Sequence, residues 1–167
     1  KFTKRLIKGK LIKRYKRFFA DINLNKEIIT AHCPNTGSMM GLLNTNNDVW
    51  ISKNNDPKRK LKFTLEIIKV KNNLVGVNTH LANKIVYHAL SNNLINELNY
   101  NQNIKAEVFF NKKTRFDFLI EKNNQKNFVE VKNVTLCRKD KISEFPDAVT
   151  SRGSKHLKTL IDAIKKG

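Results

Sequence analysis

Residues 114–120 (Thr-Arg-Phe-Asp-Phe-Leu-Ile) and residues 128–132 (Phe-Val-Glu-Val-Lys) decide the fold of the C-terminal half. Both segments are rich in aromatic and β-branched residues, which favours β-strands. The polar stretch between them contains Asn123 and Asn124, and asparagine tolerates the positive φ angles of tight turns. The sequence therefore predicts a β-hairpin with a two-residue turn.

The turn fixes which residues of the hairpin face each other. Phe118 is expected opposite Val129, and Asp117 is expected directly opposite Glu130. Side chains alternate along a strand, so Asp117, Glu130 and Lys132 emerge on one face. The other face is apolar and suits a core: Phe116, Phe118, Val129 and Val131.

The polar face combines two carboxylates with one ammonium group. Carboxylates directly opposite each other on a sheet repel, and a divalent cation between them removes that penalty. Lys132 lies about 6 to 7 Å beyond Glu130 along the strand, within reach of a water or a phosphate. The pattern predicts a magnesium-dependent phosphodiesterase site at Asp117, Glu130 and Lys132, with a solvated face and a salt bridge as the alternative.

The composition points to a polyanionic partner. The 167 residues include 33 Lys and Arg against 14 Asp and Glu, a net charge of +19, with a pI of about 10.1. This favours nucleic acid, and an anionic membrane second, although the Lys, Asn and Ile content is also typical of an AT-rich genome. Two cysteines, no signal peptide and no long apolar run favour a cytoplasmic protein without a membrane span.

The first seventy or so residues are predicted to form short strands. Strands at roughly ten-residue spacing suggest a small barrel or sandwich, and an oligonucleotide-binding (OB) barrel is compatible with them. The expected strands are Leu6–Lys13, Phe18–Leu24, Glu27–His32, Val49–Ser52 and Leu61–Val70.

The densest basic stretch of the chain lies in this part. It also carries aromatic side chains, so we predict that it binds nucleic acid, with a charged edge strand as the alternative. The predicted contacts are Lys13, Arg14, Tyr15, Lys16 and Arg17.

The pattern changes near Asn73, where we place a boundary between domains at 1–73 and 74–167. The second half is predicted to contain helices and strands in alternation, which gives a mixed α+β protein. The expected elements are a strand at Leu74–Val77, a helix from Asn78 or Thr79 that buries Leu81, Ile85, Val86, Ala89 and Leu90, a short helix at Asn93–Leu98, strands at Ile104–Phe110, Arg115–Glu121 and Phe128–Val134, and a helix at Ser151–Lys166.

Several stretches resemble the sugar fermentation stimulation protein A family, described as DNA-binding proteins or nucleases. The match extends over nearly the whole chain. It is carried by residues 31–39, 76–79 with Asn83, 115–118, 129–136, 145–150, 152–153 and 155–157.

This resemblance implies an N-terminal OB-like barrel followed by a nuclease-like domain of the PD-(D/E)XK class. Asp117 and Glu130 would bind Mg²⁺, or Mn²⁺, together with the carbonyl of Val131. Lys132 would assist the attacking water. Relatives often carry a Glu on the first helix of this domain, where this chain has His88, so weak magnesium binding is expected. A surface histidine without a metal role is the alternative. The nuclease core also continues past its second helix in this class, whereas the sequence stops at Gly167 and does not begin with Met, which suggests a partial chain.

Further nucleic-acid contacts are predicted at Arg115 and on the last helix, at Arg152 and Lys155. A helix start capped by Thr150 or Ser151 is a sound phosphate site, and a solvated helix face is the alternative. Asp147 is expected to be a turn residue. The loop from Cys33 to Ser38 is expected either to hold a phosphate or to order the barrel.

The sequence thus predicts a metal-dependent nuclease that acts on DNA or RNA, with DNA the more natural substrate. A non-catalytic DNA-binding regulator is the alternative, and an RNA-binding barrel protein is a third reading. The sequence leaves a homo-oligomer open.

Overall fold

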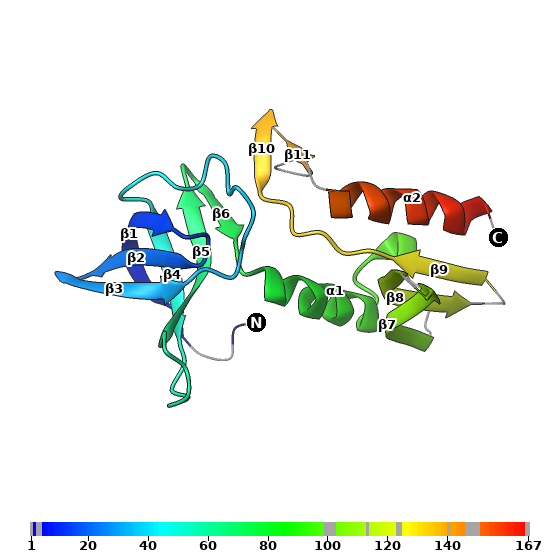
Figure 1. Cartoon of the computed structure of the whole chain (residues 1–167), viewed down its shortest axis with the longest axis horizontal. Helices are drawn as coiled ribbons and strands as arrows, with labels where there is room; N and C mark the ends of the chain where they lie inside the picture. The colour runs from blue at the N-terminus through cyan, green and yellow to red at the C-terminus, as the bar shows by residue number, and fades with distance from the viewer. Residues whose placement is uncertain are drawn as a thin grey trace. The chain divides into compact units, whose positions relative to one another are not determined.

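The computed structural model describes residues 2, 5–98, 103–112, 114–122, 125–139, 141–145 and 151–165, with only the backbone at Lys122 and Arg152. The chain forms two compact units (Figure 1). We call Lys1–His80 with Asn133–Ala148 the barrel unit, and Leu81–Lys132 with Val149–Gly167 the sheet-and-helix unit.

The barrel unit is built from one six-stranded sheet and a separate two-stranded hairpin. The sheet runs in the order β3-β2-β1-β4-β5-β6. Its strands are β1 (Ile7–Tyr15), β2 (Phe19–Leu24), β3 (Glu27–His32), β4 (Asp48–Lys53), β5 (Phe63–Val70) and β6 (Asn73–Gly76), and the hairpin strands are β10 (Leu136–Lys139) and β11 (Ile142–Glu144).

A short parallel pairing between β3 and β5 closes this sheet into a five-stranded barrel. Ala31 pairs with Phe63 and His32 with Thr64, so the first and fifth strands of the sheet order meet. The OB-like barrel, which is compatible with the strand spacing and implied by the family resemblance, is therefore confirmed, as is the mixed α+β class. The predicted strands lie within about two residues of the observed ones, because alternating apolar side chains mark each of them.

The barrel buries a large cluster of apolar side chains. Leu11, Ile22 and Ile51 are 0% exposed, and they come from three different strands. Gly9 lets two of these strands approach closely, since a Cβ there would lie 2.6 Å from side-chain carbons of both Ile22 and Leu24. The inward alternation of each strand thus builds a complete core.

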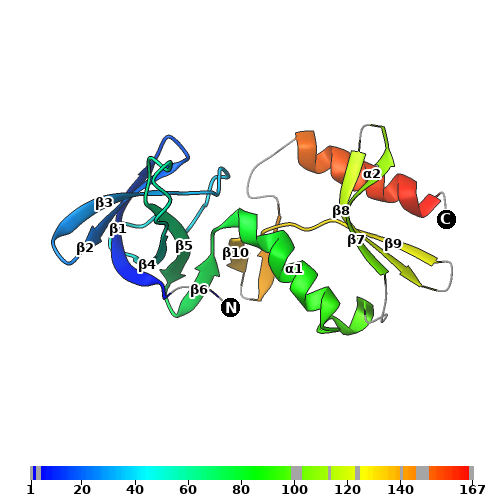
Figure 2. The same cartoon turned by 90° about the horizontal axis from the view of Figure 1, so that it is seen from below.

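The sheet-and-helix unit contains a three-stranded antiparallel sheet in the order β7-β8-β9. Helix α1 packs against it through Leu90, which clusters with Phe118 and Ile120 of the sheet. The elements are η1 (Thr79–Leu81, at the end of the barrel unit), α1 (Ala82–Ser91), η2 (Asn96–Leu98), β7 (Asn103–Asn111), β8 (Thr114–Lys122), β9 (Gln125–Val129) and α2 (Ser151–Lys165). Figure 2 shows α1 and α2 as separate helices beside this sheet. No described helix is long and apolar enough to cross a membrane.

Some sequence expectations were wrong in this half. The strand expected at Phe128–Val134 ends at Val129, because the next free amide, that of Val131, is bound by a carboxylate instead of a strand partner. Ile85, expected in the core, is 63% exposed, and Tyr87 of α1 stacks on Phe118 instead. The helix expected at Asn93–Leu98 is limited to one 3₁₀ turn, and the β10–β11 hairpin was not predicted.

The compact units do not follow a single cut in the sequence. Residues 133–148 return to the barrel unit after the sheet is complete, and Asn133 donates a hydrogen bond to the carbonyl of Gly76. The division into domains 1–73 and 74–167 stays a prediction. A cut based on composition cannot register a segment that returns to the first unit.

Candidate carboxylate, lysine and histidine site

The β8–β9 hairpin has the register that the sequence predicted. Phe118 pairs with Val129, and the ladder continues to the pair of Lys122 and Gln125. The expected turn at Asn123 and Asn124 lies outside the described residues. The ladder stops one pair short of Asp117 and Glu130, so these carboxylates take partners of their own.

Asp117 is held by two hydrogen-bond donors. The side-chain amide of Asn83, in the first turn of α1, donates to Oδ1 over 2.7 Å. The backbone amide of Val131 donates to Oδ2, also over 2.7 Å. Asp117 therefore ties the start of α1 and the segment after β9 to strand β8.

Glu130 lies in the centre of a second group of polar side chains. Its Oε1 contacts both the Lys132 ammonium and Nδ1 of His156, a residue of α2. Lys132 Nζ and His156 Nδ1 lie 3.5 Å apart. The Glu130 side chain is only 7% exposed, so this carboxylate is shielded from water while its partners reach the surface.

The second oxygen of Glu130 has no such partner. Within the described part of the chain, Oε2 is buried and accepts no hydrogen bond. A buried carboxylate oxygen without a donor is costly, and native structures rarely leave one unsatisfied. This atom is therefore the one most available to an added ligand.

The donor set around these residues fits a hard cation. Glu130 offers the unpartnered Oε2, and Asp117 keeps lone pairs beyond the two hydrogen bonds that it accepts. The carbonyl of Val131, predicted as a third ligand, belongs to the residue whose amide binds Asp117. No three His, Cys, Asp or Glu side chains of the described residues gather as a metal cluster, so a cation here would need backbone or water oxygens as well.

The basic stretch at the end of β1 is partly used by the barrel itself. Lys13 lies 3.9 Å from Asp21 and 5.4 Å from the ring of Tyr15. Tyr15 stacks on Phe19 and is 36% exposed. Nucleic-acid binding by these residues stays a prediction.

Arg14 has a structural role that the sequence did not reveal. Its Nη2 donates to the carbonyls of Asn35 and Gly37 at 2.9 and 3.0 Å, and to that of Arg17 at 3.1 Å. It thereby braces both the turn after β1 and the loop from Cys33 to Ser38. Of the two expectations for that loop, the one in which it orders the barrel has these contacts in its favour.

The remaining predicted nucleic-acid contacts lie on several elements. Lys16 and Arg17 form the turn between β1 and β2, where both have positive φ. Arg115, on β8, pairs with Glu107 over 2.7 Å. Lys155 is exposed in the first turns of α2, and the side chain of Arg152 lies outside the described residues, as do Asp147 and Thr150.

Two residues of the site were not assigned to it from the sequence. His156 and Asn83 entered the sequence analysis only as parts of the matching stretches. His88, the α1 residue expected near the carboxylates, is exposed in the last turn of the helix, whereas Asn83 in the first turn reaches Asp117. Both missed residues lie within the stretches that carry the family resemblance, and that was the available signal.

The comparisons with known proteins agree with this two-part architecture. Residues 12–77 match the family model described as the SfsA N-terminal OB domain, and residues 80–167 match the Sugar fermentation stimulation protein RE domain. A solved structure of Pyrococcus furiosus SfsA, described as in complex with Ca²⁺, has a similar fold, with a TM-score of 0.81 at 23% identity. That match covers 96% of this chain and 68% of the solved one.

Relatives in sequence identify the family. The sugar fermentation stimulation protein homolog of Pelagibacter ubique is 75% identical over 166 residues, which cover 99% of this chain and 72% of that protein. The homolog of Maricaulis maris is 44% identical over 169 residues, again with 72% of the relative covered. The chain is thus an OB barrel followed by an α/β unit. It belongs to the sugar fermentation stimulation protein family.

Proposed function

We propose that this protein is a metal-dependent nuclease, which hydrolyses phosphodiester bonds of DNA or RNA at the site around Glu130. The observation that carries the proposal is the buried Glu130 carboxylate. One of its oxygens contacts Lys132 and His156, and the other has no donor among the described residues. A purely structural ion pair gains nothing from an unsatisfied buried oxygen.

Lys132 is placed to act on a phosphate. Contact with Glu130 fixes its ammonium, and the side chain remains 31% exposed, so a substrate can reach it. A fixed cation stabilises the negative charge that develops on a phosphoryl group in the transition state. This role requires the ammonium and the carboxylate together.

His156 is placed to move a proton. Its Nδ1 contacts Glu130 Oε1, which orients the ring from α2. The ring's second nitrogen, Nε2, can then exchange a proton with a water or a leaving oxygen. Asn83 and the Val131 amide hold Asp117 in place, so the second carboxylate is fixed before any ligand arrives.

The residues that would hold the metal are Glu130, Asp117 and the carbonyl of Val131. A bound Mg²⁺ or Mn²⁺ would supply Lewis-acid stabilisation of the phosphoryl oxygens. Pyrococcus furiosus SfsA is described as in complex with Ca²⁺, and Ca²⁺, like Mg²⁺, takes oxygen ligands. The net charge of +19 would favour attraction of the polyanionic substrate.

The second candidate is a non-catalytic nucleic-acid-binding protein. It is favoured because no three His, Cys, Asp or Glu side chains of the described residues are grouped so that they could hold a metal ion. It is disfavoured by the two carboxylates themselves, which repel a polyanion and contribute nothing to binding it.

A cleavage assay with matched variants tests the proposal. The chain is incubated with single- and double-stranded DNA and with RNA, in Mg²⁺, in Mn²⁺ and in chelator. Glu130→Gln and Lys132→Gln should each lower the cleavage rate by about 100-fold or more, since a positioned catalytic group typically contributes 10²–10⁴.

The control is an exposed pair in the same unit. Lys105 and Glu121 lie 2.6 Å apart on β7 and β8, so Glu121→Gln and Lys105→Gln remove equivalent charges away from the site. These controls should cleave at nearly the unaltered rate. The assignment of the site would be overturned if Glu130→Gln still cleaves. It would also be overturned if the variants of Glu121 and Lys105 lose as much cleavage as those of Glu130 and Lys132.

A further inference from the structure

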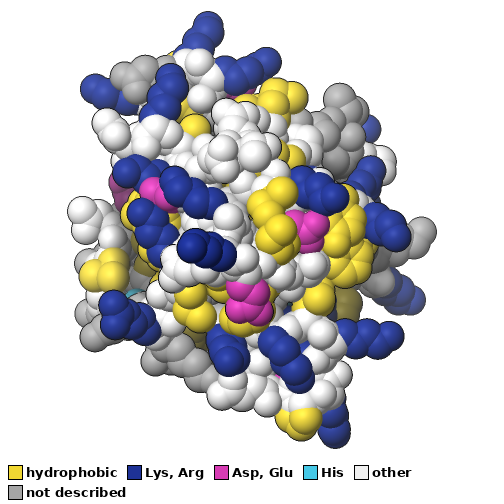
Figure 3. Space-filling model, turned by 90° about the vertical axis from the view of Figure 1, so that its left-hand side faces the viewer, with side chains coloured by type: hydrophobic (Ala, Val, Ile, Leu, Met, Phe, Trp, Pro, Cys, Tyr) yellow, Lys and Arg dark blue, Asp and Glu magenta, His cyan; other side chains and the backbone are white. Residues whose placement is uncertain are grey.

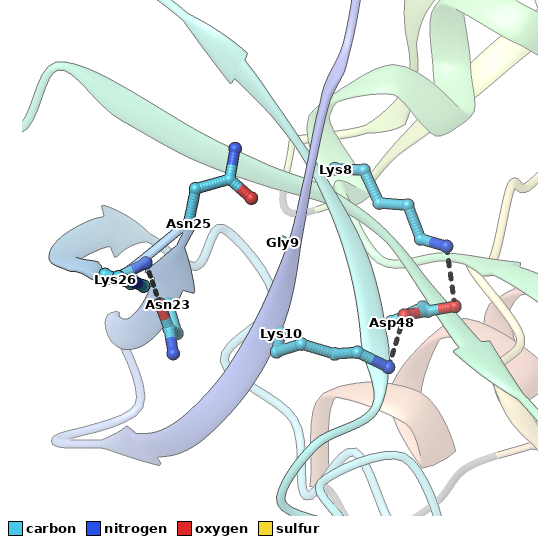
Figure 4. Close-up of a pocket in the computed structure, with 7 residues that line it drawn as sticks. All are labelled: Lys8, Gly9, Lys10, Asn23, Asn25, Lys26 and Asp48. Atoms are coloured by element: carbon cyan, nitrogen blue, oxygen red, sulfur yellow. Dashed lines mark hydrogen bonds and ion pairs between the residues drawn. The ribbon is translucent and has the colours of Figure 1, made fainter.

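A pocket on the barrel unit lies outside the site proposed for cleavage. Its volume is about 600 Å³, and it lies between the start of β1, the β2–β3 turn and the start of β4 (Figure 4). The side chains and backbone that line it are those of Lys8, Gly9, Lys10, Asn23, Asn25, Lys26 and Asp48.

The pocket is cationic. Its lining contains three lysines and one aspartate, which together carry a net charge of +2. Lys8 and Lys10 each approach one oxygen of Asp48, at 2.9 and 2.7 Å, as the dashed lines of Figure 4 show. Hydrogen bonds from these two lysines lower the pKa of Asp48 to about 2, so the carboxylate stays ionised.

Asp48 thus holds two lysines of one strand in a fixed arrangement. Both remain more than half exposed, at 58% and 54%, so their ammonium groups stay open to a ligand. On the other side of the pocket, the turn residues Asn25 and Lys26 are exposed as well. The Asn23 side-chain oxygen accepts a hydrogen bond from the backbone amide of Lys26, which fixes this turn. The pocket is therefore open, with cations on both sides and side-chain amides between them.

An aromatic ring lies beside these cations. Trp50 is the cross-strand partner of Lys8, and the Lys8 ammonium lies 5.6 Å from the centre of its ring. Trp50 is half-buried on the outer side of β4, since its neighbours Val49 and Ile51 point into the core. It is the single tryptophan of the chain.

Proteins that bind single-stranded nucleic acid without sequence preference use basic side chains to contact the phosphates. They use aromatic side chains to stack with the bases. An open pocket of this kind suits an extended strand better than a small anion, which is normally enclosed by its ligands. The basic stretch at Lys13–Arg17 lies at the far end of the same strand, β1, and is distinct from this pocket.

We propose that this pocket and Trp50 form a binding site for single-stranded nucleic acid. Phosphates contact Lys8, Lys10 and Lys26, and an unpaired base stacks on Trp50. This proposal takes its class of ligand, nucleic acid, from the proposed function. The site lies in the barrel unit and is tested by binding, so the result does not depend on whether the protein cleaves nucleic acid.

Trp50 itself provides the measurement. An oligothymidylate of about 12 nucleotides, in chelator to prevent cleavage, is titrated into the chain while tryptophan fluorescence is recorded. We expect saturable quenching that weakens with salt. The same strand in duplex form should quench much less, because its bases are already stacked on one another.

Two triple variants with the same change in net charge separate this site from general attraction. Lys8→Gln, Lys10→Gln and Lys26→Gln keep hydrogen-bond donors for Asp48, so the fold should hold, as a melting curve will verify. Lys58→Gln, Lys60→Gln and Lys71→Gln, exposed lysines of the same unit, are the control. The site variant should bind at least tenfold more weakly, with a log–log salt slope smaller by about 2, as expected for three single-strand phosphate contacts.

Trp50→Leu tests the stacking contact, followed with a labelled oligonucleotide. It should weaken binding by about fivefold or more, and Trp50→Phe should recover most of the affinity. The proposal is overturned if the two triple variants bind alike. It is also overturned if duplex binds as well as the single strand, or if inorganic phosphate changes the Trp50 signal and the oligonucleotide does not.

Discussion

The two units of this protein bury their apolar side chains to very different degrees. In the barrel unit, twelve buried apolar residues form one cluster, most of them 0% exposed. Among the described residues of the sheet-and-helix unit the equivalent cluster has three, and α2 leaves Leu157 59%, Ile161 52% and Ile164 82% exposed. Around α2, the Glu130 side chain is only 7% exposed and contacts His156 of this helix.

The difference teaches what each unit is built for. A closed barrel needs only the inward side chains of its own strands, so its stability lies in its core. Its outer face can then be varied freely, and Figure 3 shows Lys and Arg side chains spread over one such face, with few carboxylates among them. The second unit also shields a charged group, the Glu130 side chain, and shielded charges are common at functional sites.

The largest expected effect comes from truncating a side chain in the core of the barrel. Ile22→Ala should lower the free energy of unfolding by about 2–5 kcal/mol, because Ile22 is fully buried and the cavity cannot collapse. Ile161→Ala on α2 should change it by less than about 0.5 kcal/mol, as expected for an exposed side chain. Urea denaturation of both variants measures this. Equal losses would mean that the exposed stripe of α2 is buried in solution, and the comparison would fail.

A smaller effect concerns the close approach of β1 and β2 at Gly9. Gly9→Ala should destabilise by about 1–3 kcal/mol, because its Cβ would lie 2.6 Å from two packed side chains. Gly76→Ala is the matched control, since a Cβ there meets nothing within 4 Å. Melting curves compare the two. A neutral Gly9→Ala would show that the strands can separate without cost.

The next prediction concerns the polar arrangement of the second unit. Asn83→Ala removes the donor to Asp117 Oδ1 and should cost about 1 kcal/mol, the usual net value of a hydrogen bond. Asn92→Ala, which removes an exposed hydrogen bond to the carbonyl of His88, should cost less. Chemical denaturation distinguishes them. If Asn92→Ala costs as much, Asn83 does not support the site in the way described.

The smallest effect is a dependence on pH within the barrel unit. Burial, and then the nearby Arg59 and His80, lower the pKa of His32 below its usual value of 6.5. The neutral ring is therefore favoured in the folded state, so stability is complete above pH 6.5 and decreases as the pH falls through the lowered pKa. His32→Gln should reduce the slope of the melting temperature against pH between pH 7 and about pH 5. His88→Gln, on the exposed end of α1, should leave the slope in place, and the same slope in both variants would exclude His32 as its origin.

The sequence predicted those features that depend on local pattern. Alternation gave the barrel strands, and two asparagines gave the hairpin register that pairs Phe118 with Val129. It could not predict that Asp117 would take the amide of Val131, which ends the strand early. It also could not show that His156, 26 residues after Glu130, reaches the same carboxylate, because that contact depends on how a helix packs on a sheet.

Arg14 illustrates the same limit in the barrel. Its position in a basic stretch predicted a phosphate contact, whereas its guanidinium binds backbone carbonyls of the loop after β3. Charge in the sequence indicates where cations occur, and only the three-dimensional structure shows which of them the fold itself uses. The lysines around Asp48 were missed because they are not part of one dense basic stretch and come together only in the folded barrel. Lys8 and Lys10 lie on β1, Lys26 lies in the turn after β2 and Asp48 lies on β4, so no single stretch of sequence brings them together.

The central claim is that Glu130 and Asp117 form one divalent-cation site, and calorimetric titration of Mn²⁺ tests it most directly. The unaltered chain should bind one ion, and Glu130→Gln should lose that binding while its melting curve stays cooperative. Glu107→Gln, an exposed carboxylate of the same unit paired with Arg115, should bind as the unaltered chain does. Unchanged Mn²⁺ binding in Glu130→Gln, or no binding by any of the three proteins, would contradict the account.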